Sequence, residues 1–248
     1  REVFMILKYK IIIPARYESS RFPGKPLAMI DGIPMIRRVW KKCIEVLPVE
    51  DVLIATDSEN IYDFCINNSM EVIMTPYCMT GTDRVYQASL GLDADIFINV
   101  QGDEPLIDPN DIKTIIDYSK KNPDFVVNAM CELSSQREFN SISIPKVVVN
   151  LKGELMYMSR SPIPITKEKK MVKSYKQVCI YAFPKKHLKS FAGQSKKTPV
   201  ECIEDIEIIR FLEMGETVKM VEVSQSSIAV DYPEDIRRVE NALRTNSK

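Results

Sequence analysis

The basic residues Arg16, Arg21 and Lys25 come directly after a short apolar run that ends at Pro14. In α/β sheets, ligands bind at the carboxyl ends of strands, so three positive side chains at this point predict an anion site. Arginine offers a planar fork to phosphate oxygens, lysine offers a point charge, and Gly24 allows backbone N–H groups to approach closely. The spacing matches neither a Walker A loop nor a GxGxxG loop. The segment therefore predicts a phosphate site, with an ordinary solvated basic loop as the alternative.

A second candidate anion site is the turn that opens a helix expected over residues 82–90. The turn reads Thr80-Gly81-Thr82-Asp83-Arg84. The N-terminal amides and the dipole of a helix favour a negative group or a base carbonyl at this position. The alternative is an ordinary N-cap, in which Thr80 or Thr82 accepts a hydrogen bond from the first turn and no ligand is involved.

Two acidic stretches are the most informative feature of the sequence. Asp103 and Glu104 follow the apolar run at 97–100, and Asp231 lies between a short strand-like segment and a helix. Carboxylates aimed at phosphates require a cation between them, and Mg²⁺ commonly takes one or two carboxylates together with phosphate oxygens. We therefore expect Asp103 and Asp231 to hold Mg²⁺ beside a nucleoside triphosphate. Helix capping is the alternative role for Asp231.

The single histidine, His187, lies on an expected surface helix, and we interpret it as a solvated side chain. A base triad that depends on histidine is therefore not available at the expected site. Phosphoryl and nucleotidyl transfer can rely on a metal ion and positive charge instead. The charged residues thus favour nucleotide chemistry without a histidine base.

Composition excludes several classes of function. Lys+Arg 34 against Asp+Glu 34 gives no net charge, so general nucleic-acid binding is not expected. Six cysteines occur without a CxxC pair, which argues against a zinc site and suits a reducing cytoplasm. No apolar stretch approaches the ~18 residues of a membrane span, so no membrane partner is expected. Residues 1–10 are too short and interrupted for a signal peptide, and we expect residues 1–9 to be an N-terminal extension that is partly foreign, with Met5 as the natural start.

The pattern of the 248 residues predicts one α/β domain over residues 1–248. Short β-branched runs alternate with amphipathic stretches, which predicts βαβ units and a mixed, mostly parallel sheet covered on both faces. Strands are expected at 10–14, 51–56, 71–74, 95–100, 125–131, 146–150, 155–159, 176–183 and 218–223. Helices are expected at 35–47, 60–68, 82–90, 109–121, 185–191, 199–214 and 233–243, with Trp40 in the core.

Two segments depart from the simple alternation. Gly153 predicts a tight hairpin turn, so an antiparallel hairpin is expected between 146 and 159. The helix expected over 199–214 is apolar on more than one side, which predicts burial against a partner subunit or a substrate lid. On it, a core stripe is expected at Ile203, Ile206 and Ile209, and a candidate sugar-facing patch at Glu201, Glu204 and Asp205.

Several segments together resemble the 3-deoxy-manno-octulosonate (Kdo) cytidylyltransferases, or CMP-Kdo synthetases, in the same order and over nearly the whole chain. The strings IPARYxSxRxPGKPL and NVQGDEP are the most specific of them. The matching segments are 12–27, 81–84, 99–105, 157–164, 180–182 and 230–235.

The resemblance implies a Rossmann-like nucleotidyltransferase fold, a homodimer formed through the inserted hairpin, and a reaction for lipopolysaccharide synthesis. In that family the anomeric hydroxyl of the ulosonic acid attacks the α-phosphate of CTP and releases pyrophosphate. Carried over by motif, Asp103 and Asp231 hold Mg²⁺, and the remaining residues bind the two substrates. CTP would be bound by Arg16, Arg21, Lys25, Thr82, Arg84 and Gln101, and the sugar by Arg160, Gln177, Tyr181 and Glu207.

The departures from the family pattern fall on the sugar half. Gln177 stands where the family usually has His, Ile208 replaces a Gln, and Tyr232 replaces a Thr. A site that hydrogen-bonds a hydroxyl discriminates strongly against ligands that leave its polar groups unpaired. We therefore expect the acceptor to be Kdo or a variant such as an amino-substituted Kdo or a nonulosonate. Alternatives are transfer from a nucleotide with a different base, or a binding protein that has lost catalysis.

Overall fold

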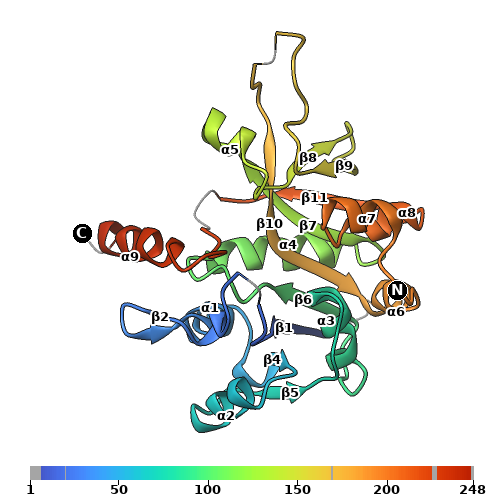
Figure 1. Cartoon of the computed structure of the whole chain (residues 1–248). Coiled ribbons are helices and arrows are strands. Elements are labelled where there is room, and N and C mark those ends of the chain that lie inside the picture. The colour runs from blue at the N-terminus through green and yellow to red at the C-terminus, as the bar shows by residue number, and fades with distance from the viewer. Residues whose placement is uncertain (1–6, 20, 169, 225–227, 247–248) are drawn as a thin grey trace.

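A mixed sheet lies at the centre of the computed structural model, which describes residues 7–19, 21–168, 170–224 and 228–246 (Figure 1). The strands are β1 Tyr9–Ala15, β4 Val52–Thr56, β5 Val72–Met74, β6 Ile96–Val100, β7 Val126–Glu132, β8 Lys146–Val149, β9 Leu155–Ser159, β10 Tyr175–Pro184 and β11 Val218–Glu222. Their order is β11-β7-β10-β6-β1-β4-β5, and β8 joins through β10 and carries β9. Only β10 runs antiparallel to its neighbours β6 and β7 along this described path. The predicted strands and the mostly parallel sheet are confirmed within one or two residues.

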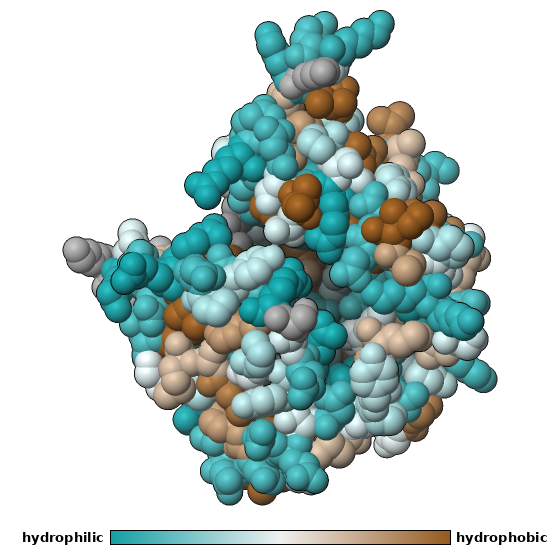
Figure 2. Space-filling model, in the orientation of Figure 1, coloured by the Kyte–Doolittle hydropathy of each residue, from teal (hydrophilic) through white to brown (hydrophobic). Residues whose placement is uncertain are grey.

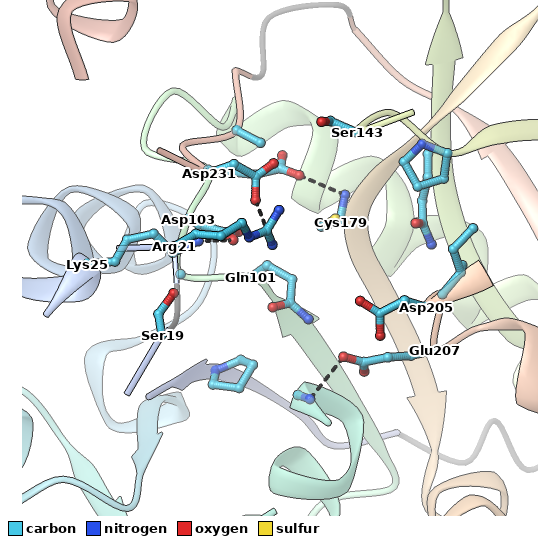
Figure 3. Close-up of a pocket in the computed structure, with 18 of the residues that line it drawn as sticks. Ser19, Arg21, Lys25, Gln101, Asp103, Ser143, Cys179, Asp205, Glu207 and Asp231 are labelled. Carbon is cyan, nitrogen blue, oxygen red and sulfur yellow. Dashed lines mark hydrogen bonds and ion pairs between the residues drawn. The ribbon is translucent and has the colours of Figure 1, made fainter. Parts of the chain in front are cut away.

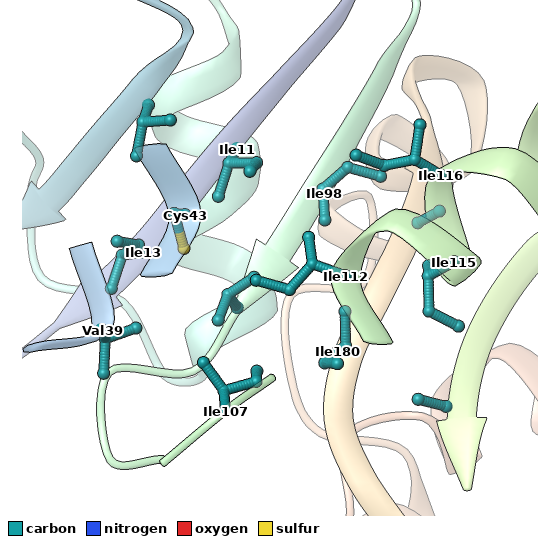
Figure 4. Close-up of a cluster of buried hydrophobic side chains, with 14 of the residues drawn as sticks. Ile11, Ile13, Val39, Cys43, Ile98, Ile107, Ile112, Ile115, Ile116 and Ile180 are labelled. Carbon is teal, nitrogen blue, oxygen red and sulfur yellow. The ribbon is translucent and has the colours of Figure 1, made fainter. Parts of the chain in front are cut away.

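Helices cover both faces of this sheet. They are α1 Met35–Ile44, α2 Glu59–Asn67, α3 Gly81–Ser89, α4 Pro109–Lys121, α5 Gln136–Asn140, α6 Lys185–Ala192, α7 Pro199–Glu204, α8 Ile209–Glu213 and α9 Asp235–Asn246. The side chains of β1 alternate between the faces, because successive residues of a strand point to opposite sides. Ile11 and Ile13 pack with α1 and α4 in one buried cluster (Figure 4), and Ile12 packs in the cluster that contains α6 and α8.

Trp40 is less buried than predicted. It lies half-buried at the margin of the first cluster. Short elements were missed because too few residues carry their pattern: the β-hairpin β2 Met29–Ile30 and β3 Ile33–Pro34, the 3-10 helices Lys25–Leu27 and Val49–Asp51, and α5. The last helix begins at Asp235, two residues after the predicted start.

The helix predicted over 199–214 is wrong as a single element. It divides into α7 and α8 at Asp205, whose φ of 50° lies in the left-handed region. The break changes which residues are buried: Ile206 and Ile209 are buried, but Ile203 is 81% exposed. The acidic patch also separates, because Glu201 is buried against Arg210 at 2.7 Å while Asp205 is exposed.

The hairpin between β8 and β9 is confirmed, with Gly153 at a φ of 71° in its turn. The prediction that His187 is a solvated side chain is wrong. Its imidazole is half-buried and lies between the Glu216 carboxylate and the carbonyl oxygen of Asp124. No helix in the described part of the chain is long and apolar enough to cross a membrane.

Candidate active site

A cavity of about 750 Å³ opens at the carboxyl ends of β1 and β6, where the surface is hollowed in Figure 2. The segment after β1, the segment after β6, the first half of β10 and the segment before α9 form its walls. Of the residues predicted to bind substrates or metal, all but Thr82 line this cavity. The structure thus brings the two halves of the predicted site together.

The basic and acidic segments meet inside the cavity, as Figure 3 shows. Lys25 Nζ lies 2.7 Å from Asp103 Oδ2 and donates to the carbonyl oxygen of Val230 at 2.9 Å. Arg21 Nη2 lies 3.1 Å from Asp231 Oδ1. The backbone N–H of Val230 donates to the carbonyl oxygen of Asp103 at 2.9 Å, which joins the two acidic segments directly. Arg16 lies in the same cavity with an exposed side chain.

The carboxylate of Asp231 is not a helix cap. In the described part of the chain, no N–H group of α9 donates to the Asp231 carboxylate, so the capping alternative for Asp231 is wrong, and its side chain faces Arg21. Asp235, the first residue of α9, holds the segment before the helix in place, because its Oδ2 accepts hydrogen bonds from the N–H groups of Asp231 and Tyr232, both at 3.0 Å. Two carboxylates on one cavity wall, next to three basic residues, fit Mg²⁺ that also binds phosphate oxygens.

The amino end of α3 is occupied by a side chain of the protein. Glu207 accepts from the N–H groups of Gly81 at 3.0 Å and Thr82 at 2.8 Å, and from Thr82 Oγ1 at 2.6 Å. Thr80 caps the helix through the N–H of Asp83. The alternative of an N-cap formed by Thr80 is confirmed, and the Glu207 carboxylate supplies the negative charge that the helix dipole favours at these amides.

The residues predicted by motif to bind the nucleotide differ in whether their side chains are free to contact a ligand. Thr82 is buried under Glu207, and Arg84 is buried and contacts Asp57 at 2.7 Å and Thr75 at 2.6 Å. Gln101, in contrast, lies directly over the amino end of α3. A Cβ atom at Gly81 would lie 2.9 Å from Gln101 Nε2, so a side chain at this position would displace the end of the Gln101 side chain.

Arg160 connects the loops of the part of the cavity that is predicted to bind the sugar. Its guanidinium donates to the carbonyl oxygens of Ile142 at 3.0 Å, Glu204 at 2.6 Å and Asp205 at 2.9 Å. The Glu204 carboxylate accepts from the N–H of Arg160 at 2.9 Å. Arg160 therefore organises the wall of the cavity through backbone carbonyls.

A β-bulge links β10 to the segment that carries the acidic pair after β6. The register to β7 shifts between Val178 and Tyr181. At the bulge, the N–H of Cys179 donates to Glu104 Oε1 at 3.0 Å, and its carbonyl oxygen accepts from the N–H of Gln101 at 3.2 Å. Burial raises the pKa of the Cys179 thiol and of the Tyr181 hydroxyl, so both groups are neutral near pH 7.

Comparison with known proteins decides the family. The cytidylyltransferase family model matches residues 10–220. A 3-deoxy-manno-octulosonate cytidylyltransferase from Syntrophotalea carbinolica is 37% identical, over 94% of this chain and 97% of the relative. The chain belongs to the 3-deoxy-manno-octulosonate cytidylyltransferase family.

The chain is also similar to a second named relative and to a solved structure. An 8-amino-3,8-dideoxy-manno-octulosonate cytidylyltransferase from Shewanella frigidimarina is 38% identical, over 96% of this chain and 99% of the relative. A solved structure of CMP:2-keto-3-deoxy-manno-octonic acid synthetase complexed with CTP has a TM-score of 0.88 at 34% identity, covering 96% of this chain and 99% of that one. The Rossmann-like nucleotidyltransferase fold implied by the sequence motifs is confirmed.

Among the cavity residues that were not predicted as site residues are Glu104 and Cys179, which meet at the bulge, and Lys197, which pairs with Asp205 at 2.6 Å. Only Glu104 carried a signal, as the second residue of the acidic pair. Cys179 lies at the bulge, and Lys197 pairs with Asp205 at the break between α7 and α8. Neither feature has a recognisable sequence pattern.

Proposed function

We propose that this protein transfers CMP from CTP to the anomeric hydroxyl of a 3-deoxy-ulosonic acid, Kdo or a close variant, and releases pyrophosphate. The contact of Lys25 with Asp103 at 2.7 Å carries the proposal, because it places phosphate-binding cations and metal-binding carboxylates in one cavity. Named relatives with this activity over nearly the whole chain support it.

In the reaction, the anomeric hydroxyl gives its proton to solvent and its oxygen bonds to the α-phosphorus of CTP. The bond between the α-phosphorus and the bridging oxygen breaks, and pyrophosphate leaves with the electron pair of that bond. Arg16, Arg21 and Lys25 stabilise the charge that grows on the departing pyrophosphate. The walls of the cavity hold the two anions together against their repulsion.

Asp103 and Asp231 are the residues that would hold Mg²⁺. When bound, the ion supplies positive charge at the α-phosphate and lowers the pKa of the attacking hydroxyl. Lys25 and Arg21 pair with these carboxylates in the structure, so both cations exchange a carboxylate for phosphate oxygens when the substrates bind.

Pyrophosphate release tests the proposal. The purified protein is incubated with each of the four nucleoside triphosphates and a panel of ulosonic acids, with Mg²⁺ or with a chelator. We expect release with CTP and an ulosonic acid in the presence of Mg²⁺. If pyrophosphate is released only with another nucleoside triphosphate, that nucleotide and not CTP is the donor substrate. CTP binding in isothermal titration without any product would instead support a protein that has lost catalysis.

An amino-substituted acceptor is the second candidate. Enzymes named for the 8-amino sugar, from Shewanella frigidimarina and Shewanella baltica, are 38% and 37% identical to this chain. Gln177, which differs from the family pattern and is predicted to bind the sugar, lines the cavity. Turnover of Kdo compared with 8-amino-Kdo decides between them, and an overwhelming preference for plain Kdo would refute the variant.

The surface around β9 and α7 supports a homodimer. Met156 on β9 is 61% exposed, Ile203 on α7 is 81% exposed, and Ile142 nearby is 74% exposed. Figure 2 shows brown side chains on this upper part of the molecule. Exposed apolar groups gathered in this way are typical of a protein interface. We place the reaction in the cytoplasm, in keeping with six free cysteines, and its product in lipopolysaccharide or surface-glycan synthesis.

A further inference from the structure

The orientation of one buried amide, that of Asn128 on β7, is fixed by its surroundings. Asn128 is fully buried, and its Nδ2 donates to the carbonyl oxygens of Val178 and Ile180, both at 3.0 Å. These carbonyls lie on either side of Cys179 at the β10 bulge. Carbonyl oxygens only accept hydrogen bonds, so the nitrogen end of the Asn128 amide must face them, and its oxygen must face the other way.

The orientation of Gln177 follows from that of Asn128. Asn128 Oδ1 lies 3.0 Å from Gln177 Nε2. Because Oδ1 can only accept, the NH₂ group of Gln177 must face it. The backbone N–H of Gln177 is also committed, to the carbonyl oxygen of Pro145 at 3.1 Å. Gln177 lines the cavity, and within the described part of the chain no hydrogen bond to its Oε1 is formed.

We propose that Gln177 selects an acceptor sugar that presents a hydrogen-bond donor to it, and that Asn128 is the positioning residue that fixes this preference. The inference rests on the proposed function and refines its substrate class. A hydroxyl or an ammonium on the sugar satisfies Gln177 Oε1, whereas a methylene or an ether oxygen leaves it unpaired. An imidazole at this position, as in the family pattern, can present either a donor or an acceptor, so Gln177 narrows the choice.

The test is a double-mutant cycle in which one change is made in residue 177 and the other in a hydroxyl of the sugar. kcat/KM is measured for Kdo and for analogues that each lack one hydroxyl, with the wild-type protein and with Gln177→Leu. With the wild-type protein, we expect kcat/KM for one analogue to be about tenfold or more below kcat/KM for Kdo. With Gln177→Leu, the two values should be almost equal, because the partner of that hydroxyl is already absent. An amino group at the same carbon should retain the wild-type kcat/KM within a few-fold.

Two further variants complete the test. Asn128→Leu releases the Gln177 amide, so the penalty for the same analogue should shrink while the KM for CTP stays within about twofold. Gln194→Leu, at an exposed glutamine outside the cavity, is the matched control and should reproduce the wild-type pattern. Circular dichroism establishes that each variant is folded.

The possible failures are distinct. If Gln177→Leu keeps the same penalty as the wild type for every analogue, the role of Gln177 is wrong although the proposed function stands. If the Gln177 result holds but Asn128→Leu leaves the penalty unchanged, Gln177 is oriented without Asn128. If CTP gives no pyrophosphate with any ulosonic acid, the proposed function itself fails.

Discussion

Lys25 Nζ lies 2.7 Å from Asp103 and 2.9 Å from the carbonyl oxygen of Val230, so one ammonium joins three distant segments of the chain. The partners are separated by 78 and 205 residues along the sequence. The ion pair is partly buried, with side-chain exposures of 17% and 30%, so solvent screens it less than a surface pair. The cavity therefore holds its opposite charges close together, ready for exchange with an ionic ligand.

The carboxylates are the first target for mutation. Asp103→Asn and Asp231→Asn should each reduce turnover by about 100-fold or more, because each removes a negative ligand for Mg²⁺. Both side chains are partly exposed, so the fold should persist. Steady-state pyrophosphate release, with circular dichroism as the check of folding, measures the effect.

The matched control for these variants is Asp117→Asn. Asp117 is an exposed acid on α4 that pairs with Lys120 at 2.9 Å, outside the cavity. It should leave turnover unchanged. Near-normal turnover of Asp103→Asn or Asp231→Asn would show that the carboxylate concerned is not a required metal ligand.

Glu207→Gln should destabilise the protein by about 1 kcal/mol, because the carboxylate that satisfies the first amides of α3 loses its charge. Chemical denaturation measures the free energy of unfolding. Asp108→Asn is the matched control, since Asp108 caps α4 outside the cavity and accepts from the N–H of Asn110 at 2.8 Å. Only Glu207→Gln should also raise the KM for the acceptor sugar. An unchanged free energy of unfolding would contradict the capping role.

The sheet and the charged cavity could be predicted because they depend on local patterns. Alternating apolar residues define β1 and β6, and parallel strands bring their carboxyl ends to one edge. Charged residues directly after these strands must therefore meet. This argument from strand patterns does not extend to Asp231, because the segment before α9 has no strong pattern of its own. Asp231 could be placed at the cavity only through its motif.

Contacts between side chains of distant segments could not be predicted in this way. Glu207 reaches α3 because the chain breaks at Asp205, and an acidic residue in the left-handed region has no signature in a helical pattern. The bond between Gln177 and Asn128 depends on the register of β10 against β7, which a bulge shifts. Tertiary register is not encoded in the spacing of either strand alone.

The proposed dimer predicts a change of mass in solution. Ile203→Lys should convert a dimer to a monomer at micromolar concentration, because a charge placed in an apolar interface must be desolvated. Sedimentation velocity measures the mass. Ile66→Lys is the control, since Ile66 is 55% exposed on α2, at the opposite end of the molecule (Figure 1). A wild-type protein that is monomeric at this concentration would contradict the dimer.

Lys146 provides a prediction on pH. It is fully buried on β8, and its ammonium donates to the carbonyl oxygens of Ser141 and Ile144, both at 2.7 Å, and of Arg160. Burial and the charge of Arg160 lower its pKa to about 8, against an opposing effect of Glu204. Between pH 8 and 10.5 the unfolded chain therefore binds more protons at this group than the folded chain does.

The sign of the pH effect follows from this difference. Over this range, rising pH favours the folded state through Lys146, by up to ~1.4 kcal/mol per pH unit. Lys146→Met should be less stable at pH 7, because three buried carbonyl oxygens lose their donor. Its deficit relative to the wild type should widen as the pH rises from 8 to 10. Denaturation at each pH measures the difference in free energy of unfolding between variant and wild type. For the control Lys113→Met, at an exposed lysine on α4, this difference should not change with pH. A deficit that narrows with rising pH would mean that Lys146 has a raised pKa, as expected for a lysine paired with a carboxylate.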